Sequence, residues 1–108
     1  NLLKQRLERE GFTVTLAEDG EAALKVLKGP AFDLMLLDII LPKISGFELM
    51  EQLKSDPSYG HVRTVIISNL GQESDIERGQ SLGAIGYFVK AKVSIEELVE
   101  RVKEFLGA

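Results

Sequence analysis

The sequence predicts an α/β fold with a doubly wound parallel sheet, and three observations support this. Short apolar runs at 34–37, 65–67 and 87–89 are bounded by turn residues, as in strands buried on both faces of a parallel sheet. Helical patterns alternate with these strands, which is typical of a parallel sheet covered by helices. The length of 108 residues fits one domain. We therefore expect a single domain over residues 1–108.

The first third of the chain predicts a helix, a short strand and a second helix. Leucines at helical spacing over 2–7 predict the first helix, and Gly11 ends it. Apolar and polar residues alternate over 12–16, which predicts a half-buried edge strand. Apolar positions over 22–27 predict the next helix. The chain thus opens on a helix, whereas such folds usually open on a strand.

The rest of the chain predicts three strands that alternate with three helices. The strands are the apolar runs named above, and the helices are expected over 47–53, over 76–82 and after Ser94. Ser94 with Glu97 predicts a capping box at the start of the last helix. The composition of 55–60 predicts a loop.

Each of the three buried strands ends in a polar residue, namely Asp38, Ser68 and Lys90. Ligands of parallel sheets bind outside the carboxyl ends of the strands, so we expect these side chains to meet at one rim. A carboxylate can attack phosphorus, a hydroxyl can donate to a phosphoryl oxygen, and an ammonium can neutralise developing charge. The three residues together predict a site for a phosphoryl group.

Composition narrows the classes of function. The net charge of -4 and the pI near 5.0 argue against binding to nucleic acid or to an anionic membrane surface. The absence of cysteine excludes disulfides, a thiol nucleophile and cysteine metal sites. No apolar run approaches the roughly 20 residues needed to cross a bilayer. We expect a cytoplasmic protein.

Several motifs, in their order and spacing, resemble the receiver domain of two-component response regulators over essentially the whole chain. These motifs are Asp38 with Leu41-Pro42 and Gly46-Phe47-Glu48, Ser68 after Val65-Ile66-Ile67, and Gly83-Ala84 before Tyr87-Phe88-Val89-Lys90. The resemblance implies a flavodoxin-like sheet of strand order 2-1-3-4-5, with the site at the switch point between the first and third strands.

The resemblance also implies roles for individual residues. Asp38 is the phosphoacceptor, which takes a phosphoryl group from a histidine kinase or phosphotransfer protein, and Ser68 and Lys90 contact that group. Ser68 and Tyr87 form the switch. Mg²⁺ is coordinated by Asp38 and the backbone carbonyl of Ile40. The fourth helix, the Tyr87 strand and the last helix form the surface for a downstream protein, and the domain is not an enzyme.

The largest departure from the family is at the start of the chain. Receivers open with a buried strand and an acidic pair that holds Mg²⁺, whereas Asn1 already lies where the first helix should be. The absent strand would lie between 12–16 and the Asp38 strand. Burying about five apolar residues contributes roughly 8–15 kcal/mol, and whole domains are stable by only about 5–15 kcal/mol. We expect an N-terminally incomplete receiver that binds Mg²⁺ weakly and does not fold alone in the usual way.

Three explanations of this start are open. An upstream segment can exist, which we favour; the sequence can be a truncation or part of a chimera; or a strand from another chain can fill the gap, which predicts a strand-swapped homodimer.

Smaller departures lead to further expectations. Ala91 follows Lys90 where the family usually has a proline, often in a cis bond, and a cis bond to a non-proline costs about 2.5–4 kcal/mol, so we expect a trans bond. Asn69 narrows the entrance to the site. Ile40 and Leu70 are apolar at positions that tune dephosphorylation, which predicts slow hydrolysis of the acyl phosphate.

Each site residue also has an ordinary structural explanation, which for Tyr87 is packing in the core or at the rim. Asp38 could satisfy loop amides, Ser68 could form a turn, and Lys90 could be a solvated lysine. His61 is expected to be exposed and without function. The alternative function is a phosphorylation-deficient pseudo-receiver, or a truncated or engineered fragment, that acts as a protein-binding or strand-swapped module. An aspartyl-phosphate hydrolase is disfavoured because Ile40 stands where such enzymes have a second Asp.

Overall fold

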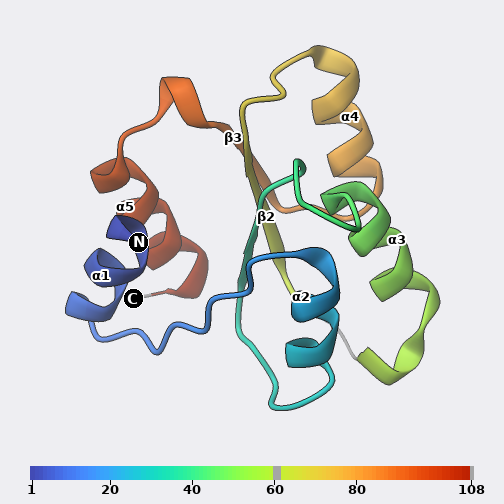
Figure 1. Ribbon diagram of the computed structural model, residues 1–108. Coiled ribbons are helices and arrows are strands. Elements are labelled where there is room, and N and C mark those ends of the chain that lie inside the picture. Colours follow the sequence, from blue (N-terminus) through green and yellow to red (C-terminus); the bar gives the residue numbers. More distant parts are fainter. Residues whose placement is uncertain (60–61, 108) are drawn as a thin grey trace. The chain divides into compact units, whose positions relative to one another are not determined.

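The computed structural model describes residues 1–59 and 62–107, which form two compact units (Figure 1). The larger unit is residues 17–92, and the smaller one combines residues 1–16 with the residues from 93 onward. His61 and the end of the predicted loop at 55–60 lie outside the described residues.

The larger unit contains a parallel sheet of order β1-β2-β3. Its strands are β1 (Met35–Leu37), β2 (Thr64–Ser68) and β3 (Gly86–Val89), so the three predicted buried strands are confirmed. Every residue of β2 is buried, as expected for a middle strand rich in β-branched residues.

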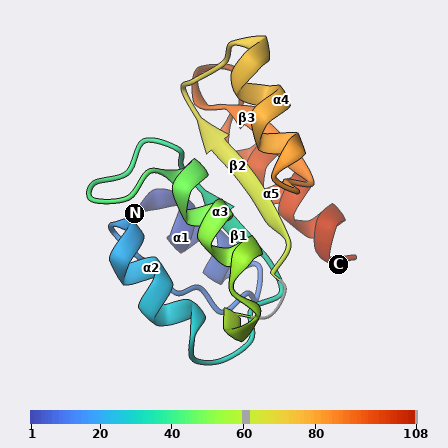
Figure 2. The same cartoon turned by 90° about the vertical axis from the view of Figure 1, so that its right-hand side faces the viewer.

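Three helices of the larger unit lie on one face of this sheet (Figures 1 and 2). They are α2 (Gly20–Leu27), α3 (Gly46–Ser55) and α4 (Glu73–Ser81), and short 3₁₀ helices follow α3 at Pro57–Tyr59 and β3 at Lys90–Lys92. The core between sheet and helices is made of Leu37, Ile39, Phe47, Leu49, Met50 and Ile66.

In the smaller unit, α1 (Leu2–Arg9) packs against α5 (Ile95–Leu106). An ion pair of 2.6 Å joins Arg6 to Glu96 across the two helices. Lys103 of α5 pairs with Glu10, the residue after α1, at 2.5 Å.

The predicted helix signals are mostly confirmed. Ser94 caps α5, since its hydroxyl accepts a hydrogen bond from the Glu97 amide at 3.1 Å. The fourth helix begins at Glu73, ahead of the predicted 76. The prediction missed its first turn because that turn is polar and carries no apolar pattern. Asp75 in that turn accepts a hydrogen bond from the Gln72 amide at 3.3 Å, which stabilises the earlier start. None of the helices in residues 1–59 and 62–107 is long and apolar enough to span a membrane.

The prediction of an edge strand at 12–16 is wrong, because this segment contains no strand. A strand is defined by backbone hydrogen bonds to a neighbouring strand, and no strand among the described residues pairs with this segment. Alternation of apolar and polar residues cannot supply the missing partner. The segment therefore connects α1 to the turn before α2 without joining a sheet.

Candidate functional site

Asp38 lies directly after β1, where the apolar strand gives way to a loop. Its neighbours Leu37 and Ile39 are only 4% and 3% exposed, so the backbone on both sides of the carboxylate is anchored in the core. The Oδ1 atom of Asp38 accepts a hydrogen bond from the Ile40 amide at 3.0 Å. The side chain is nevertheless 27% exposed. Asp38 is thus a fixed carboxylate that a molecule in solution can reach.

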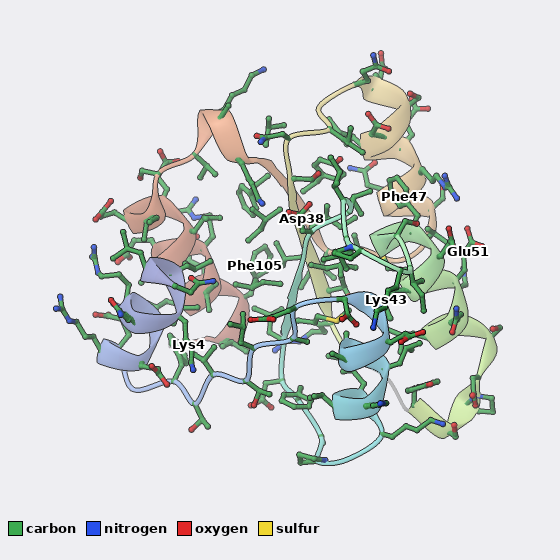
Figure 3. All side chains as sticks on the ribbon, viewed as in Figure 1. Lys4, Asp38, Lys43, Phe47, Glu51 and Phe105 are labelled. Carbon is green, nitrogen blue, oxygen red and sulfur yellow. The ribbon has the colours of Figure 1, made fainter. Side chains whose placement is uncertain are left out.

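Lys90 follows β3 directly and binds this carboxylate. Its Nζ lies 2.5 Å from the Oδ2 of Asp38, whose position in the larger unit is labelled in Figure 3. Because β2 lies between β1 and β3, the ion pair joins the ends of the two outer strands across the end of the middle one. Ser68 is the last residue of that middle strand. The carboxyl ends of the three strands therefore bring Asp38, Lys90 and Ser68 to one rim.

Ser68 is completely buried, and its hydroxyl is held by the loop that follows it. The Oγ atom accepts a hydrogen bond from the Leu70 amide at 3.3 Å. A hydroxyl that accepts in this way still has its own proton to donate. Ser68 can therefore donate to an oxygen that arrives at the rim.

Tyr87 holds the same loop from the other side, because its hydroxyl donates a hydrogen bond to the carbonyl oxygen of Leu70. Burial raises the pKa of the Tyr87 hydroxyl, and the negative charges of Asp75 and Asp38 raise it further. The phenol therefore remains a protonated donor at neutral pH. Ser68 and Tyr87 together fix the two sides of Leu70, which links the buried hydroxyl to the aromatic ring.

A second group of charges lies at the start of α2. The Oδ1 of Asp19 accepts a hydrogen bond from the Ala22 amide at 2.8 Å and so caps the helix. Lys43, labelled in Figure 3, approaches Asp19 Oδ2 to 3.7 Å and Glu21 Oε2 to 3.3 Å. The Ala22 hydrogen bond lowers the pKa of Asp19, and the charge of Lys43 contributes in the same direction.

Comparison with protein families identifies this arrangement. The family model of the response regulator receiver domain matches residues 1–103. The chain belongs to the response regulator receiver domain family. The predicted resemblance is confirmed, and the protein is a receiver domain of two-component response regulators.

Curated proteins similar to this receiver are regulators of several kinds. It is 38% identical over 105 residues to the phosphate regulon transcriptional regulatory protein PhoB of Rhizobium meliloti, covering 97% of this chain and 46% of that protein. It is 36% identical over 92 residues to the gliding motility regulatory protein of Myxococcus xanthus, covering 85% of this chain and 12% of that protein. The chain thus spans less than half the length of these two relatives.

Solved structures confirm the flavodoxin-like α/β fold. The match to the receiver domain of the Francisella response regulator 1452 covers 98% of this chain and 85% of that structure's chain, with a TM-score of 0.88 and 26% identity. The match to a CheY-like receiver domain protein from Methanospirillum hungatei JF-1 covers 98% of this chain and 82% of that structure's chain, with a TM-score of 0.85 and 30% identity.

Receiver domains generally bind Mg²⁺ at an acidic pocket, and the residues of this chain do not by themselves complete such a pocket. No group of three or more His, Cys, Asp or Glu side chains that could hold a metal ion occurs within residues 1–59 and 62–107. Asp38 offers one carboxylate, and both of its oxygens already have partners in Ile40 and Lys90. Asp19 is occupied as a helix cap. Asp38 and the Ile40 carbonyl fall short of a resident site for a cation that takes six oxygen ligands.

Two departures of this receiver from its family can be placed in the structure. No cis peptide bond occurs among the described residues, so the Lys90–Ala91 bond is trans, as predicted. Ile40 is 63% exposed beside the Asp38 carboxylate. An apolar side chain therefore stands at the mouth of the site.

Sequence reasoning missed contacts that depend on close packing. Lys43 has a φ of +71°, which non-glycine residues rarely adopt, and its type gives no signal of this. Gly46 was noted only as part of a family motif, but a Cβ there would lie 2.5 Å from the Asp38 carbonyl oxygen. Arg78 lies 4.5 Å over the ring of Phe47, and no motif marks that contact.

Proposed function

We propose that this receiver accepts a phosphoryl group on Asp38 from a histidine kinase or phosphotransfer protein and thereby changes a surface that binds another protein. The observation that supports this most strongly is the Asp38–Lys90 ion pair across the end of β2. Three independent strands converge there on an accessible carboxylate, an ammonium and a buried hydroxyl.

The proposed reaction uses each of these groups once. A carboxylate oxygen of Asp38 attacks phosphorus, a P–O bond forms, and the P–N bond to the donor imidazole breaks. The imidazole nitrogen of the donor takes up a proton from solvent as it leaves. The Lys90 ammonium, freed from one oxygen of Asp38, neutralises the phosphoryl oxygens, and the Ser68 hydroxyl donates to one of them.

The switch is proposed to pass from Ser68 to Tyr87 through Leu70. Movement of the Ser68 hydroxyl toward the phosphoryl group weakens its bond from the Leu70 amide, and the Leu70 carbonyl is the partner of the Tyr87 hydroxyl. A change at Asp38 thus alters the balance between two arrangements of the loop after β2. The surface of α4 and β3 next to Tyr87 is the proposed contact for the downstream protein.

The product is proposed to hydrolyse slowly. The exposed side chain of Ile40 beside Asp38 offers no polar group that could orient a water molecule for attack. Decay of the phosphorylated form after removal of the donor measures this, and a lifetime of seconds would contradict it.

Phosphorylation is tested by intact mass spectrometry of the chain before and after incubation with acetyl phosphate, with and without MgCl₂. Asp38→Asn is the test variant, and Asp33→Asn, which changes an exposed aspartate near β1, is the matched control. We expect one phosphoryl increment in wild type and Asp33→Asn and none in Asp38→Asn. No increment in a folded wild-type chain would contradict the proposal.

A second candidate is the pseudo-receiver, which binds a protein without phosphorylation. It is favoured by the lack, among the described residues, of a group of three metal-binding side chains around Asp38, and by the pairing of β1 on one side only, with β2, among the described strands. An unpaired strand edge can accept a strand from another chain, so this candidate includes a strand-swapped dimer. Sedimentation of the chain at increasing concentration tests the dimer.

A further inference from the structure

Helix α4 lies unusually close to the sheet at Gly79. A Cβ atom on this buried glycine would lie 2.6 Å from Ile66 Cδ1 and 3.2 Å from Tyr87 Cδ2. Ile66 and Tyr87 are register partners on β2 and β3, so both side chains leave the sheet on the same face, toward α4. Glycine is unfavourable in the interior of a helix, but here its lack of a side chain permits the close contact.

The helix is also tied down next to this glycine. Arg78 bonds Glu51 Oε1 at 3.0 Å and lies 4.5 Å over the ring of Phe47, and both partners belong to α3 (Figure 3). Phe47 is only 5% exposed and therefore fixed in the core. These contacts of Arg78 with α3 oppose an outward movement of α4 that would make room for a side chain at 79.

The space beside Gly79 determines where the Tyr87 ring can lie. In this position the Tyr87 hydroxyl reaches the carbonyl of Leu70, and the amide of Leu70 is bound by Ser68. Displacing the ring by a few tenths of an ångström, as a Cβ at 3.2 Å requires, lengthens the hydrogen bond to Leu70.

We propose that Gly79 is a positioning residue for the switch: by lacking a side chain it sets the orientation of Tyr87, and through Leu70 it sets the arrangement of Ser68. This inference rests on the proposed function insofar as Ser68 and Tyr87 respond to phosphorylation of Asp38. The contact between Gly79 and Tyr87, however, exists without phosphorylation and can be tested separately.

The sequence allows Tyr87 to be observed alone. The chain has two tyrosines and no tryptophan, so Tyr59→Phe leaves Tyr87 as the sole phenol. Lys28 lies 5.6 Å from the centroid of the Tyr59 ring, and phenylalanine keeps that ring. All further variants are made in this background.

The test compares Gly79→Ala with Gly29→Ala. A Cβ at Gly29 meets only the Val26 carbonyl oxygen at an ordinary 3.4 Å, so this control makes the same chemical change with space for it. NMR of the ring and of the Leu70 amide in the unphosphorylated chain is the first readout, and spectrophotometric titration of the phenol is the second.

We expect Gly79→Ala to shift the Tyr87 ring and Leu70 amide signals, and to lower the pKa of the phenol because a longer hydrogen bond to the Leu70 carbonyl stabilises the protonated form less. We expect no change in Gly29→Ala. Unchanged ring and amide signals in folded Gly79→Ala would overturn the proposal. The Leu70 shift should also vanish when Tyr87→Phe has already removed the hydroxyl.

Ile66→Val separates an effect on the ring from general crowding, because it removes the Cδ1 atom that lies nearest to the added Cβ. Tyr87 signals that remain shifted in Gly79→Ala/Ile66→Val support the proposal. Signals that return to those of Ile66→Val alone would overturn it, since the displacement would then come through the core. If Gly79→Ala alone does not fold, the double variant replaces it in the NMR comparison, because Ile66→Val removes the closest contact of the added Cβ.

Phosphorylation by acetyl phosphate is the last readout. We expect Gly79→Ala to change the rate of phosphorylation when Tyr87 is present, and not when Tyr87→Phe has removed its hydroxyl. An equal change in both backgrounds would overturn the role of Gly79 in the switch. Absence of any phosphoryl increment in wild type, with the NMR effects present, would contradict the proposed function and not the positioning of Tyr87 by Gly79.

Discussion

Two groups of lysine and carboxylate in the larger unit are alike in charge and different in support. Lys90 binds Asp38 at the rim of the sheet, and Lys43 lies between Asp19 and Glu21 at the start of α2. Asp19 uses one oxygen to cap a helix, and its partner Lys43 is a loop residue with a positive φ. An Asp–Lys pair alone therefore does not mark a site for chemistry.

The difference lies in what surrounds each carboxylate. Asp38 and Lys90 extend from the ends of two strands of one sheet, with the buried Ser68 hydroxyl on the strand between them. Rigid strands hold three chemically different groups at one place, which is what transfer of a phosphoryl group requires. Asp19 has no strand on either side and acts on its own helix.

The largest expected effect distinguishes the two lysines. Lys90→Ala should slow phosphorylation of Asp38 by about 10²–10³-fold, the usual consequence of removing one group that stabilises charge in the transition state. Lys43→Ala should leave the rate nearly unchanged. Initial rates of phosphoryl incorporation from acetyl phosphate measure both, and equal effects of the two substitutions would show that the rim of the sheet has no special role.

The next effect concerns the packing that holds the Asp38 loop. Gly46→Ala places a Cβ 2.5 Å from the Asp38 carbonyl oxygen and 2.7 Å from Ile39 Cα, both of them backbone atoms that cannot rotate away. We expect a loss of about 1–3 kcal/mol in the free energy of unfolding, as for other overpacked sites. Urea denaturation measures it against Gly29→Ala, where the added methyl has space. A Gly46→Ala variant as stable as wild type would mean that this loop yields easily.

The smallest effect concerns the helix cap. The pKa of Asp19 is lowered in the folded state by the Ala22 amide and by Lys43, so its charge stabilises the fold above its unfolded pKa, near 3.8, and this contribution is lost as pH falls through the lower folded pKa. Asp19→Asn keeps a good capping side chain and removes the titration. We expect its melting temperature to be slightly below that of wild type at neutral pH and equal to it at strongly acidic pH. A difference in melting temperature that persists in acid would contradict this assignment.

Much of the fold could be predicted because apolar runs report burial directly. The runs over 34–37, 65–67 and 87–89 identified the buried strands, and their alternation with helical patterns predicted the parallel sheet. The prediction of a strand at 12–16 failed for the opposite reason, because an edge strand depends on a pairing partner and not only on its own sequence pattern.

The site could be predicted to the level of residue type and strand end, and no further. Asp38 and Lys90 were expected at one rim because each follows the carboxyl end of a strand in a parallel sheet, and the structure joins them. The partners of Ser68 and Tyr87 on Leu70 were not predictable, because they depend on the course of a loop. The close approach at Gly79 was not predictable either, because helix patterns do not report the distance between a helix and a sheet.

Locating the phosphoryl group tests the central claim most directly. After treatment with acetyl phosphate, borohydride reduction converts an aspartyl phosphate to homoserine, and trypsin places Asp38 and Asp19 on separate peptides, 29–43 and 10–25. Fragmentation of 29–43 distinguishes Asp38 from Asp33, the other carboxylate in that peptide. We predict homoserine at position 38 alone. Homoserine at position 19, or at no position in a folded chain, would contradict the account.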